Sequence, residues 1–414
     1  MERIPTTKRP SSDTGDPLAY PDPELVVALV YPTGTDGDGL RSRITRTLRR
    51  FSFGVDPIRI SEIIEKRCGR KIPKRPLPDR IEALIHEGDQ LCRPPDAAQR
   101  GAESREKILA LAAISEIAYN RSFSDGSTPQ ARPKCAHLVS SLKRPAECEE
   151  FRRVYGPGLF VIGANTPVPN RVKRLMRGGA SLNRARALVA RDMEESAAGG
   201  QKLQKTMQMA DAFILLGDGD YENAVDRVFD LIFGAPFVTP DRDEHAMFLA
   251  FSASLRSASL SRQVGAALLD DNGELIGVGC NDVPAFGGGL YWPGPGDNRD
   301  HCSSGLDTNR KVLGEIIDDV ADRLDVRRET VRARLKGAPI EDITEFGRAA
   351  HAEMEAILSA ARSGARPRGG TLYTTTFPCH NCTRHIIASG VRRVVYVEPY
   401  PKSRARELHA DAVW

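Results

Sequence analysis

The stretch His351-Ala352-Glu353 and the later stretch Pro378-Cys379-His380-Asn381-Cys382 decide the architecture of the second half of the chain. Apolar spacing around them predicts alternating helices and strands: a helix over 351–361, a strand over 371–375, a helix over about 380–388 and a strand over 394–397. Pro378 suits the start of a helix, because no backbone donor is lost there. This order predicts a layered α/β domain.

The residue types in the two stretches predict a metal site. Zinc prefers thiolate and imidazole ligands in a tetrahedron, and three protein ligands leave a fourth position open, as in catalytic sites. Cys379 and Cys382 are three residues apart at a helix start, so both sulfurs share one face. His351 and Glu353 are two apart and diverge within a helix, so a shared site requires a metal over the helix end. We predict Zn²⁺ ligands at His351, Cys379 and Cys382.

Glu353 is expected to move protons and not to bind the metal. Together the two stretches match the zinc deaminase signature H-x-E…P-C-x-x-C. In that chemistry zinc lowers the pKa of water towards about 7, and hydroxide attacks C4 of cytosine. Glu353 takes the water proton, delivers it to N3 and later protonates the leaving ammonia. A lone Cys-x-x-Cys is also typical of redox sites, so a structural or redox role is the alternative.

The segment before these motifs predicts the rest of the second domain. Asp271-Asn272-Gly273 between two apolar runs, 264–269 and 275–279, is a hairpin signal. A helix is expected over 244–258. Residues 284–347 look like an insertion, with a Gly/Pro-rich loop followed by a polar helix over about 311–335.

The first half has a different rhythm, and we place the boundary near Phe237. The expected parts are a disordered tail over 1–23, an α/β domain over 24–236 and the second domain over 237–414. Alternating strands and helices indicate a parallel sheet. Strands are predicted over 25–30, 158–163 and 212–216, and helices over 40–48, most of 54–132, 171–210 and 221–232.

A glycine-rich turn follows the first strand and resembles a damaged phosphate loop. A working loop reads G-x-x-x-x-G-K-[ST], with the lysine on the phosphates. Here Gly34 and Gly39 are followed by Leu40 and Arg41 in place of the lysine and hydroxyl residues. NTP turnover is therefore not expected, and a regulatory nucleotide pocket, a partner platform and a plain scaffold remain open. Arg41 is the candidate for the lost charge.

Bulk composition excludes several classes. The chain has 414 residues with a net charge of +4, from 59 basic and 55 acidic residues, so a polynucleotide partner is not indicated. No apolar run is long enough to span a membrane, and the N-terminus lacks a secretory signal, so we expect a cytoplasmic protein. Six of the eight cysteines are scattered, which argues against a disulfide framework.

The chain resembles the anti-phage dCTP deaminase family. Residues 351–357 with 378–382 resemble the cytidine/deoxycytidylate deaminase superfamily, and 261–266 with 277–284 resemble the substrate-binding hairpin of dCMP deaminases. Softer matches at 191–194, 297–301 and 398–403 extend the resemblance to the anti-phage family. It implies a P-loop-kinase-like parallel α/β domain joined to a cytidine-deaminase-like α/β/α domain. It also implies deamination of dCTP and dCMP, depletion of cytosine nucleotides during infection, a free nucleotide as partner, and a homo-oligomer.

Substrate contacts are predicted less directly. By resemblance Asn281 contacts the sugar or base, although this chain has Asp282 where dCMP deaminases have glycine. Arg262 and Lys402 are candidates for phosphate contact because they are basic and adjoin the hairpin and the last strand. Thr375 and Thr376 precede Pro378 and are candidates for base contact.

Two other functions stay open. One is a deaminase of tRNA adenosine, which shares the His-Ala-Glu and Pro-Cys-x-x-Cys stretches. The other is a nucleotide sensor with a zinc-stabilised fold and no turnover, against which the glutamate of the signature argues.

Overall fold

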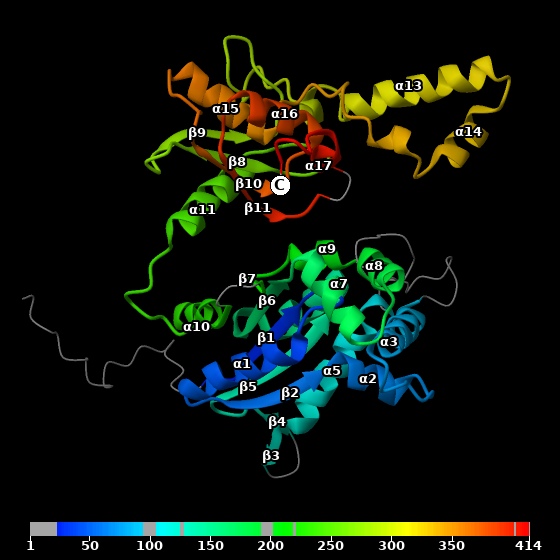
Figure 1. Ribbon diagram of the computed structural model, residues 1–414, viewed down its shortest axis with the longest axis vertical. Coiled ribbons are helices and arrows are strands. Elements are labelled where there is room, and N and C mark those ends of the chain that lie inside the picture. The colour runs from blue at the N-terminus through cyan, green and yellow to red at the C-terminus, as the bar shows by residue number, and fades with distance from the viewer. Residues whose placement is uncertain are drawn as a thin grey trace, which may run out of the picture. The chain divides into compact units, whose positions relative to one another are not determined.

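A computed structural model describes residues 23–93, 105–124, 128–191, 202–217, 221–400 and 403–413. The chain separates into two compact units, Met1–Val238 and Thr239–Trp414, shown in Figure 1. We call them the N-terminal unit and the C-terminal unit and describe each by itself. The tail expected to lack order lies outside the described residues, except for Pro23.

The N-terminal unit is built on a five-stranded parallel sheet, as expected. Its strand order is β2 (Gly54–Arg59), β5 (Cys135–Leu142), β1 (Leu25–Val30), β6 (Leu159–Asn165) and β7 (Ala212–Leu215). β1 is buried along its whole length because it lies at the centre and is covered on both faces. The expectation of a parallel α/β domain is confirmed.

Alternate residues of β1 enter two different cores. Val26 and Ala28 pack on the side of α2 (Ile60–Arg67), α5 (Ile108–Asn120) and α6 (Pro145–Tyr155). Val27 and Leu29 pack on the side of α1 (Gly37–Arg50) and α10 (Tyr221–Ile232). Since successive strand residues point to opposite faces, the unit has three layers, helix, sheet and helix.

The sequence reading of this unit was wrong in two places. Residues 54–59 form an edge strand and not a helix; Pro57 in the middle is tolerated because an edge strand has one unpaired side. The strand β5 was missed because His137 interrupts its apolar run. His137 is fully buried, and its ring nitrogens lie 2.8 Å from Glu24 Oε1 and 3.0 Å from Asp56 Oδ2, so the interior accommodates it.

The C-terminal unit contains a mixed four-stranded sheet. Its order is β11 (Arg393–Glu398), β10 (Thr371–Thr376), β8 (Gly265–Leu269) and β9 (Leu275–Cys280). β10 and β11 are parallel, and the other pairs are antiparallel. The expected hairpin joins β8 to β9, with Gly273 at φ +92° in its turn.

Helices cover both faces of this sheet. Ala267 and Leu269 face α11 (Arg242–Ser254), while Ala266 and Leu268 face α15 (Ala352–Arg362) and α16 (His380–Ala388). The α/β/α expectation for this unit is therefore confirmed. The face of the sheet that carries α15 and α16 also carries the signature residues.

The polar helix expected over 311–335 is two helices. α13 (Thr308–Arg323) and α14 (Arg328–Leu335) are separated by a turn in which Asp325 has φ +50°, a left-handed conformation that no helix continues. Leu313, Ile317 and Val331 form a small core between the two helices.

The remaining helices are short or peripheral: α3 (Leu77–Cys92), α7 (Val168–Arg177), α8 (Leu182–Arg191), α9 (Leu203–Met207), α12 (Asp300–Ser303), α17 (Ala405–Leu408) and the 3₁₀ turns η1 (Gly156–Gly158) and η2 (Pro339–Asp342). Two short strands, β3 (Ser122–Ser124) and β4 (Thr128–Gln130), pair with each other.

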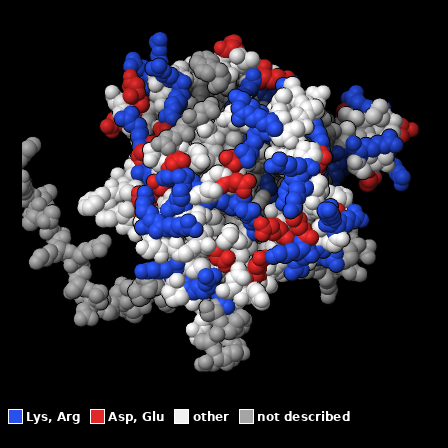
Figure 2. All heavy atoms as spheres, turned by 60° about the horizontal axis from the view of Figure 1, so that its bottom comes forward, with Lys and Arg blue, Asp and Glu red and all other residues white. Residues whose placement is uncertain are grey.

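The surface carries mixed charge. Figure 2 shows basic and acidic side chains interleaved over the face it presents, and they are not gathered into separate areas. Ion pairs such as Arg43 with Glu222 and Arg50 with Asp230 contribute to this pattern. Among the described helices, none is both long and apolar enough to cross a bilayer.

Candidate active site

His351 occupies the N-cap of α15. Its backbone is extended, with φ −76° and ψ 156°, so the residue stands outside the helical turn that follows. Ala350, just before it, donates its N–H to the carbonyl of Asp282 at 3.0 Å, which ties the helix start to the end of β9. This placement directs the imidazole past the helix end, as the two-residue spacing to Glu353 required.

Cys379 is the N-cap of α16, and Cys382 lies in its first turn. The Sγ of Cys379 accepts the N–H of Cys382 at 3.4 Å, which holds both sulfurs on one side of the helix start. Both side chains are buried. The positive end of the helix dipole favours the thiolate form of a cysteine placed there.

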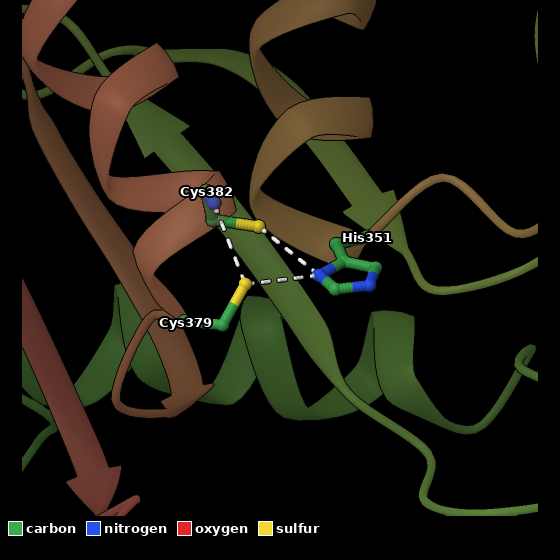
Figure 3. Close-up of side chains that lie close together, drawn as sticks. All are labelled: His351, Cys379 and Cys382. Atoms are coloured by element: carbon green, nitrogen blue, oxygen red, sulfur yellow. Dashed lines mark hydrogen bonds between the residues drawn. The ribbon is translucent and has the colours of Figure 1, made fainter. Parts of the chain in front are cut away.

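The two helix starts bring the three predicted ligands together (Figure 3). The Nδ1 atom of His351 lies 3.3 Å from the Sγ of Cys379 and 3.3 Å from the Sγ of Cys382. Tetrahedral zinc with bonds of about 2.1 Å to nitrogen and 2.3 Å to sulfur places such atoms about 3.6 Å apart. The donor set and its spacing therefore fit a zinc ion bound through Nδ1 and two sulfurs.

Glu353 lies beside this cluster. Its Oε2 atom is 3.3 Å from the Sγ of Cys382, and the side chain is only 4% exposed. Burial raises the pKa of Glu353. A carboxyl group held at the edge of the donor set, in the first turn of α15, is placed to exchange protons with a molecule bound there.

The hydrogen bond between the two thiols shifts their pKa values in opposite directions. The hydrogen bond with Cys382, followed by that with His351, lowers the pKa of Cys379 to about 4, and the pKa of Cys382 is raised by its hydrogen bond to Cys379. The hydrogen bond to Cys379 also raises the pKa of His351. Metal ligands bind in deprotonated form, so zinc favours two thiolates here.

Asn281 is engaged inside the protein. Its amide nitrogen donates to the carbonyl of Arg262 at 2.7 Å, and its Oδ1 accepts from Val264 N at 2.7 Å and from Ser257 Oγ at 2.9 Å. These bonds fix the loop between α11 and β8. Ser257 had no sequence signal, because a serine in a loop matches no motif.

The other predicted contacts have mixed outcomes. Arg262 is ion-paired with Glu398, and Thr375 Oγ1 accepts the N–H of Gly265 at 3.2 Å. Thr376 is 6% exposed, and its hydroxyl has no partner within the described protein. Lys402 lies outside the described residues. Thr376 is thus the predicted base contact whose hydrogen bonds are still open.

Asp282, which departs from the deaminase pattern, is used structurally. The carboxylate is buried, accepts the N–H of Ala258 at 3.1 Å and lies 3.7 Å from Arg299. A glycine there could make none of these contacts. The sequence reading missed this buried pair because its members are far apart in the chain.

One other donor group exists among the described residues. Atoms of Asp297, His301 and Cys302 lie within 4.8 Å of one another, but His301 and Cys302 are exposed. The carboxylate of Asp297 is already bonded to Arg299, at 2.6 Å for the shortest contact. These three residues are the alternative place where a metal ion measured in the protein could be bound.

The glycine turn of the N-terminal unit is not a phosphate cradle. Asp36 caps α1 by accepting the N–H of Gly39 at 3.2 Å, so both Gly37 and Gly39 lie inside the helix, which begins three residues earlier than predicted. Arg41 is ion-paired with Asp38 and donates to Tyr31 Oη at 3.2 Å. Gly34 adopts φ +88° against the backbone of Arg171. Asp36 and Asp38 thus engage the groups of this turn that a phosphate would need.

This fold and this donor set define a zinc-dependent deaminase. Residues 240–398 match the family described as "Cytidine and deoxycytidylate deaminase zinc-binding region". The chain is 32% identical to the deoxycytidylate deaminase of Enterobacteria phage T2 over 163 residues, which are 38% of this chain and 79% of the relative. It is 31% identical to the phage T4 enzyme over 170 residues, 77% of that relative. The chain therefore belongs to the cytidine and deoxycytidylate deaminase family.

The similarity of this chain to solved structures is weak, with low TM-scores and low sequence identity. The dCMP deaminase of cyanophage S-TIM5 in complex with dCMP and dUMP has a TM-score of 0.27 and 20% identity, covering 42% of this chain and 93% of that one. Shikimate kinase from Bacteroides thetaiotaomicron has a TM-score of 0.29 and 12% identity, covering 50% and 98%.

Proposed function

We propose that this protein removes the amino group of deoxycytidine nucleotides by hydrolysis, converting dCTP, dCMP or both to the uracil form and ammonia. The observation that carries the proposal is the buried carboxylate of Glu353, 3.3 Å from a sulfur of the donor set. A purely structural zinc site needs no such group, since it is closed by four ligands.

In this proposal His351, Cys379 and Cys382 hold the zinc ion. When bound, the ion supplies Lewis acidity that brings the pKa of a water molecule near about 7. Glu353 would take one proton from the attacking water and deliver it to N3 of the cytosine ring, and would then pass the second proton, from the new hydroxyl on C4, to the departing amino group. Burial keeps bulk water from competing for the proton. Water is consumed and ammonia released, so the reaction balances without another reactant.

The relatives support a nucleotide substrate, since the phage enzymes are named deoxycytidylate deaminases. The open hydroxyl of Thr376 is the candidate contact to the base, and Arg262 and Lys402 are candidates for the phosphates. Asn281 orders the loop around them and remains a candidate for sugar contact.

A substrate panel tests the proposal. Zinc-loaded full-length protein is incubated with dCMP, dCTP, CTP and tRNA, and ammonia release is measured. We expect release with dCMP, dCTP or both and none with tRNA. Ammonia release with tRNA alone would reassign the enzyme to the adenosine deaminases. If the zinc-loaded protein released ammonia from none of the four substrates, a sensor without turnover would be favoured.

We propose further that the reaction depletes cytosine nucleotides in the cytoplasm during phage infection and that the enzyme is a homo-oligomer. The deaminase match at residues 240–398 lies in the C-terminal unit, so the N-terminal unit is outside it. Nucleotide pools measured in infected cells that carry wild-type or Glu353→Ala protein test the first point. Sedimentation analysis tests the second.

A further inference from the structure

The N-terminal unit contains a cavity of about 230 Å³ at the carboxyl edge of its sheet. Its walls come from segments that directly follow three strands: Tyr31 to Thr35 after β1, Ile60 and Ser61 after β2, and Lys143 after β5. In open α/β sheets, ligands bind outside the carboxyl ends of the strands, where connections leave in opposite directions. The chain leaves β1 for β2, past β5, and leaves β5 for β6, past β1, so the connections leave these two neighbouring strands in opposite directions and the cavity lies where they diverge.

The cavity has an apolar wall and a basic side. The apolar wall consists of side chains from α2, α3 and α5, with Ile64, Ile81, Leu84 and Leu109 among them. The basic side consists of Arg41, Arg80, Lys143 and Arg174. Arg144 and Glu147 also line it and neutralise each other as a buried ion pair at 3.3 Å. Three of the four remaining cations are paired with carboxylates, namely Arg41 with Asp38, Arg80 with Glu65 and Arg174 with Asp36, and Lys143 donates to the carbonyl of Tyr31 at 2.7 Å. The cations still exceed these carboxylates by one, so the lining favours an anion with an apolar part.

Two of these ion pairs have exposed carboxylates. Arg174 lies 2.9 Å from Asp36, and Arg41 pairs with Asp38. Both carboxylates are exposed, and ion pairs of that kind contribute little because water screens them. An anionic ligand can therefore replace the carboxylates beside these arginines at small cost.

Thr35 gives an independent indication of a ligand. It lines the cavity and is 8% exposed, yet its hydroxyl has no hydrogen-bond partner within the described protein. A buried hydroxyl without a partner is costly and uncommon. A polar ligand in the cavity would satisfy it.

We propose that this cavity is a second, non-catalytic binding site for a nucleoside monophosphate. The base lies against the apolar wall, the phosphate lies beside Arg41 and Arg174, and Thr35 donates to the ligand. The volume is below the range of about 300–1,000 Å³ typical of sites for larger ligands, which favours one phosphate over three. The glycine turn contributes no phosphate cradle, because Asp36 already takes the N–H of Gly39.

The test is calorimetric titration of the full-length, zinc-loaded Glu353→Ala protein with dAMP, dGMP and dTMP. None of these carries the cytosine amino group, so failure of the deaminase assignment leaves the result untouched. We expect at least one to bind with a stoichiometry of one per chain, and the corresponding nucleoside and inorganic phosphate to bind at least about tenfold more weakly.

Three variants in the same background localise the site. Arg174→Ala removes a lining cation and Leu84→Trp fills the apolar part, and each should raise the dissociation constant at least about tenfold. Arg177→Ala is the matched control: it is also in the last turn of α7 but does not line the cavity, and binding should stay within about twofold. The unfolding transition that does not depend on zinc reports that the N-terminal unit of each variant is folded. Absence of binding at millimolar nucleotide, equal binding of nucleoside or phosphate alone, or binding unchanged by both cavity variants would overturn the proposal.

Discussion

At the scale of single residues, the chemistry depends on three donor atoms that lie within 4.8 Å of one another. Cys379 sits at the centre of this set, because its sulfur contacts both His351 and the N–H of Cys382. Each donor supplies one zinc bond, and loss of one of three protein ligands leaves too few to retain the metal.

We expect Cys379→Ser to lose zinc and deamination together. Zinc is measured per chain by mass spectrometry, and ammonia release is measured in parallel. The control is Cys302→Ser, which removes a donor from the exposed group formed with Asp297 and His301. Zinc retained in the first variant but lost in the second would show that the metal binds at the other group.

Glu353→Ala separates proton transfer from metal binding. The carboxylate lies beside the donors and is not expected to be one of them, so zinc content should stay near the wild-type value. Deamination should fall by at least about 100-fold, the lower end of what a positioned acid–base group contributes. Zinc and folded structure lost together would instead make the residue structural.

At the scale of elements, the position of α15 on β9 decides where His351 lies. Gly277 and Gly279 face the backbone of this helix, and a Cβ on Gly279 would overlap the carbonyl of Ala352. The glycines thus permit a close approach that no side chain allows, and His351 immediately precedes Ala352.

We expect Gly279→Ala to lower the free energy of unfolding of the C-terminal unit by about 1–3 kcal/mol through overpacking, and to weaken zinc binding. Val278→Ala, at the half-exposed position between the two glycines, should change stability by about 0.5 kcal/mol. Chemical denaturation and competition with a zinc chelator measure the two effects. A Gly279→Ala protein with unchanged zinc affinity would contradict the link between this contact and the site.

A second element contact predicts a pH dependence. Asp243 of α11 accepts from Tyr373 of β10 at 2.7 Å and from Arg393 of β11 at 2.6 and 2.8 Å. The hydrogen bond from Arg393 lowers the pKa of Asp243 below its unfolded value of about 3.9. The contact therefore stabilises the fold above that pH and is lost as the pH falls through the lower, folded-state pKa.

We expect Asp243→Asn to lower the free energy of unfolding at pH 7 by about 1 kcal/mol, since the ion pair is partly exposed. The difference from wild type should shrink as the pH falls below about 4. Unfolding curves across pH measure it, with Asp271→Asn in the exposed hairpin turn as the control. A difference that persists unchanged in acid would mean that ionisation of Asp243 does not matter.

At the scale of the whole molecule, each unit has its own cores. The zinc ligands lie in the C-terminal unit only. A ligand that binds only the folded state raises the stability of the unit that it binds. We expect calorimetry to show two unfolding transitions, of which only one moves to lower temperature when a chelator removes zinc. A single transition that shifts as a whole would show that the units unfold together.

The sequence by itself determined the chemistry of the site and most of its elements. The residue types and spacings of His351, Glu353, Cys379 and Cys382 specified a zinc deaminase, because ligand softness and helix geometry leave few other uses for that pattern. Apolar runs located β1, β6 and α10, and the Asn-Gly turn located the hairpin. The strands β2 and β5 were not predicted, because their polar residues and proline interrupt the apolar pattern that identifies a strand in the sequence.

Only the tertiary structure decided how the remaining side chains are used. Asn281 and Arg262, both predicted substrate contacts, also bond to the loop and to Glu398, and Asp36 caps the helix that follows the glycine turn. These outcomes depend on contacts between residues distant in the chain, which spacing along a sequence cannot reveal. The cavity beside Thr35 exists for the same reason, since segments after three separate strands form it.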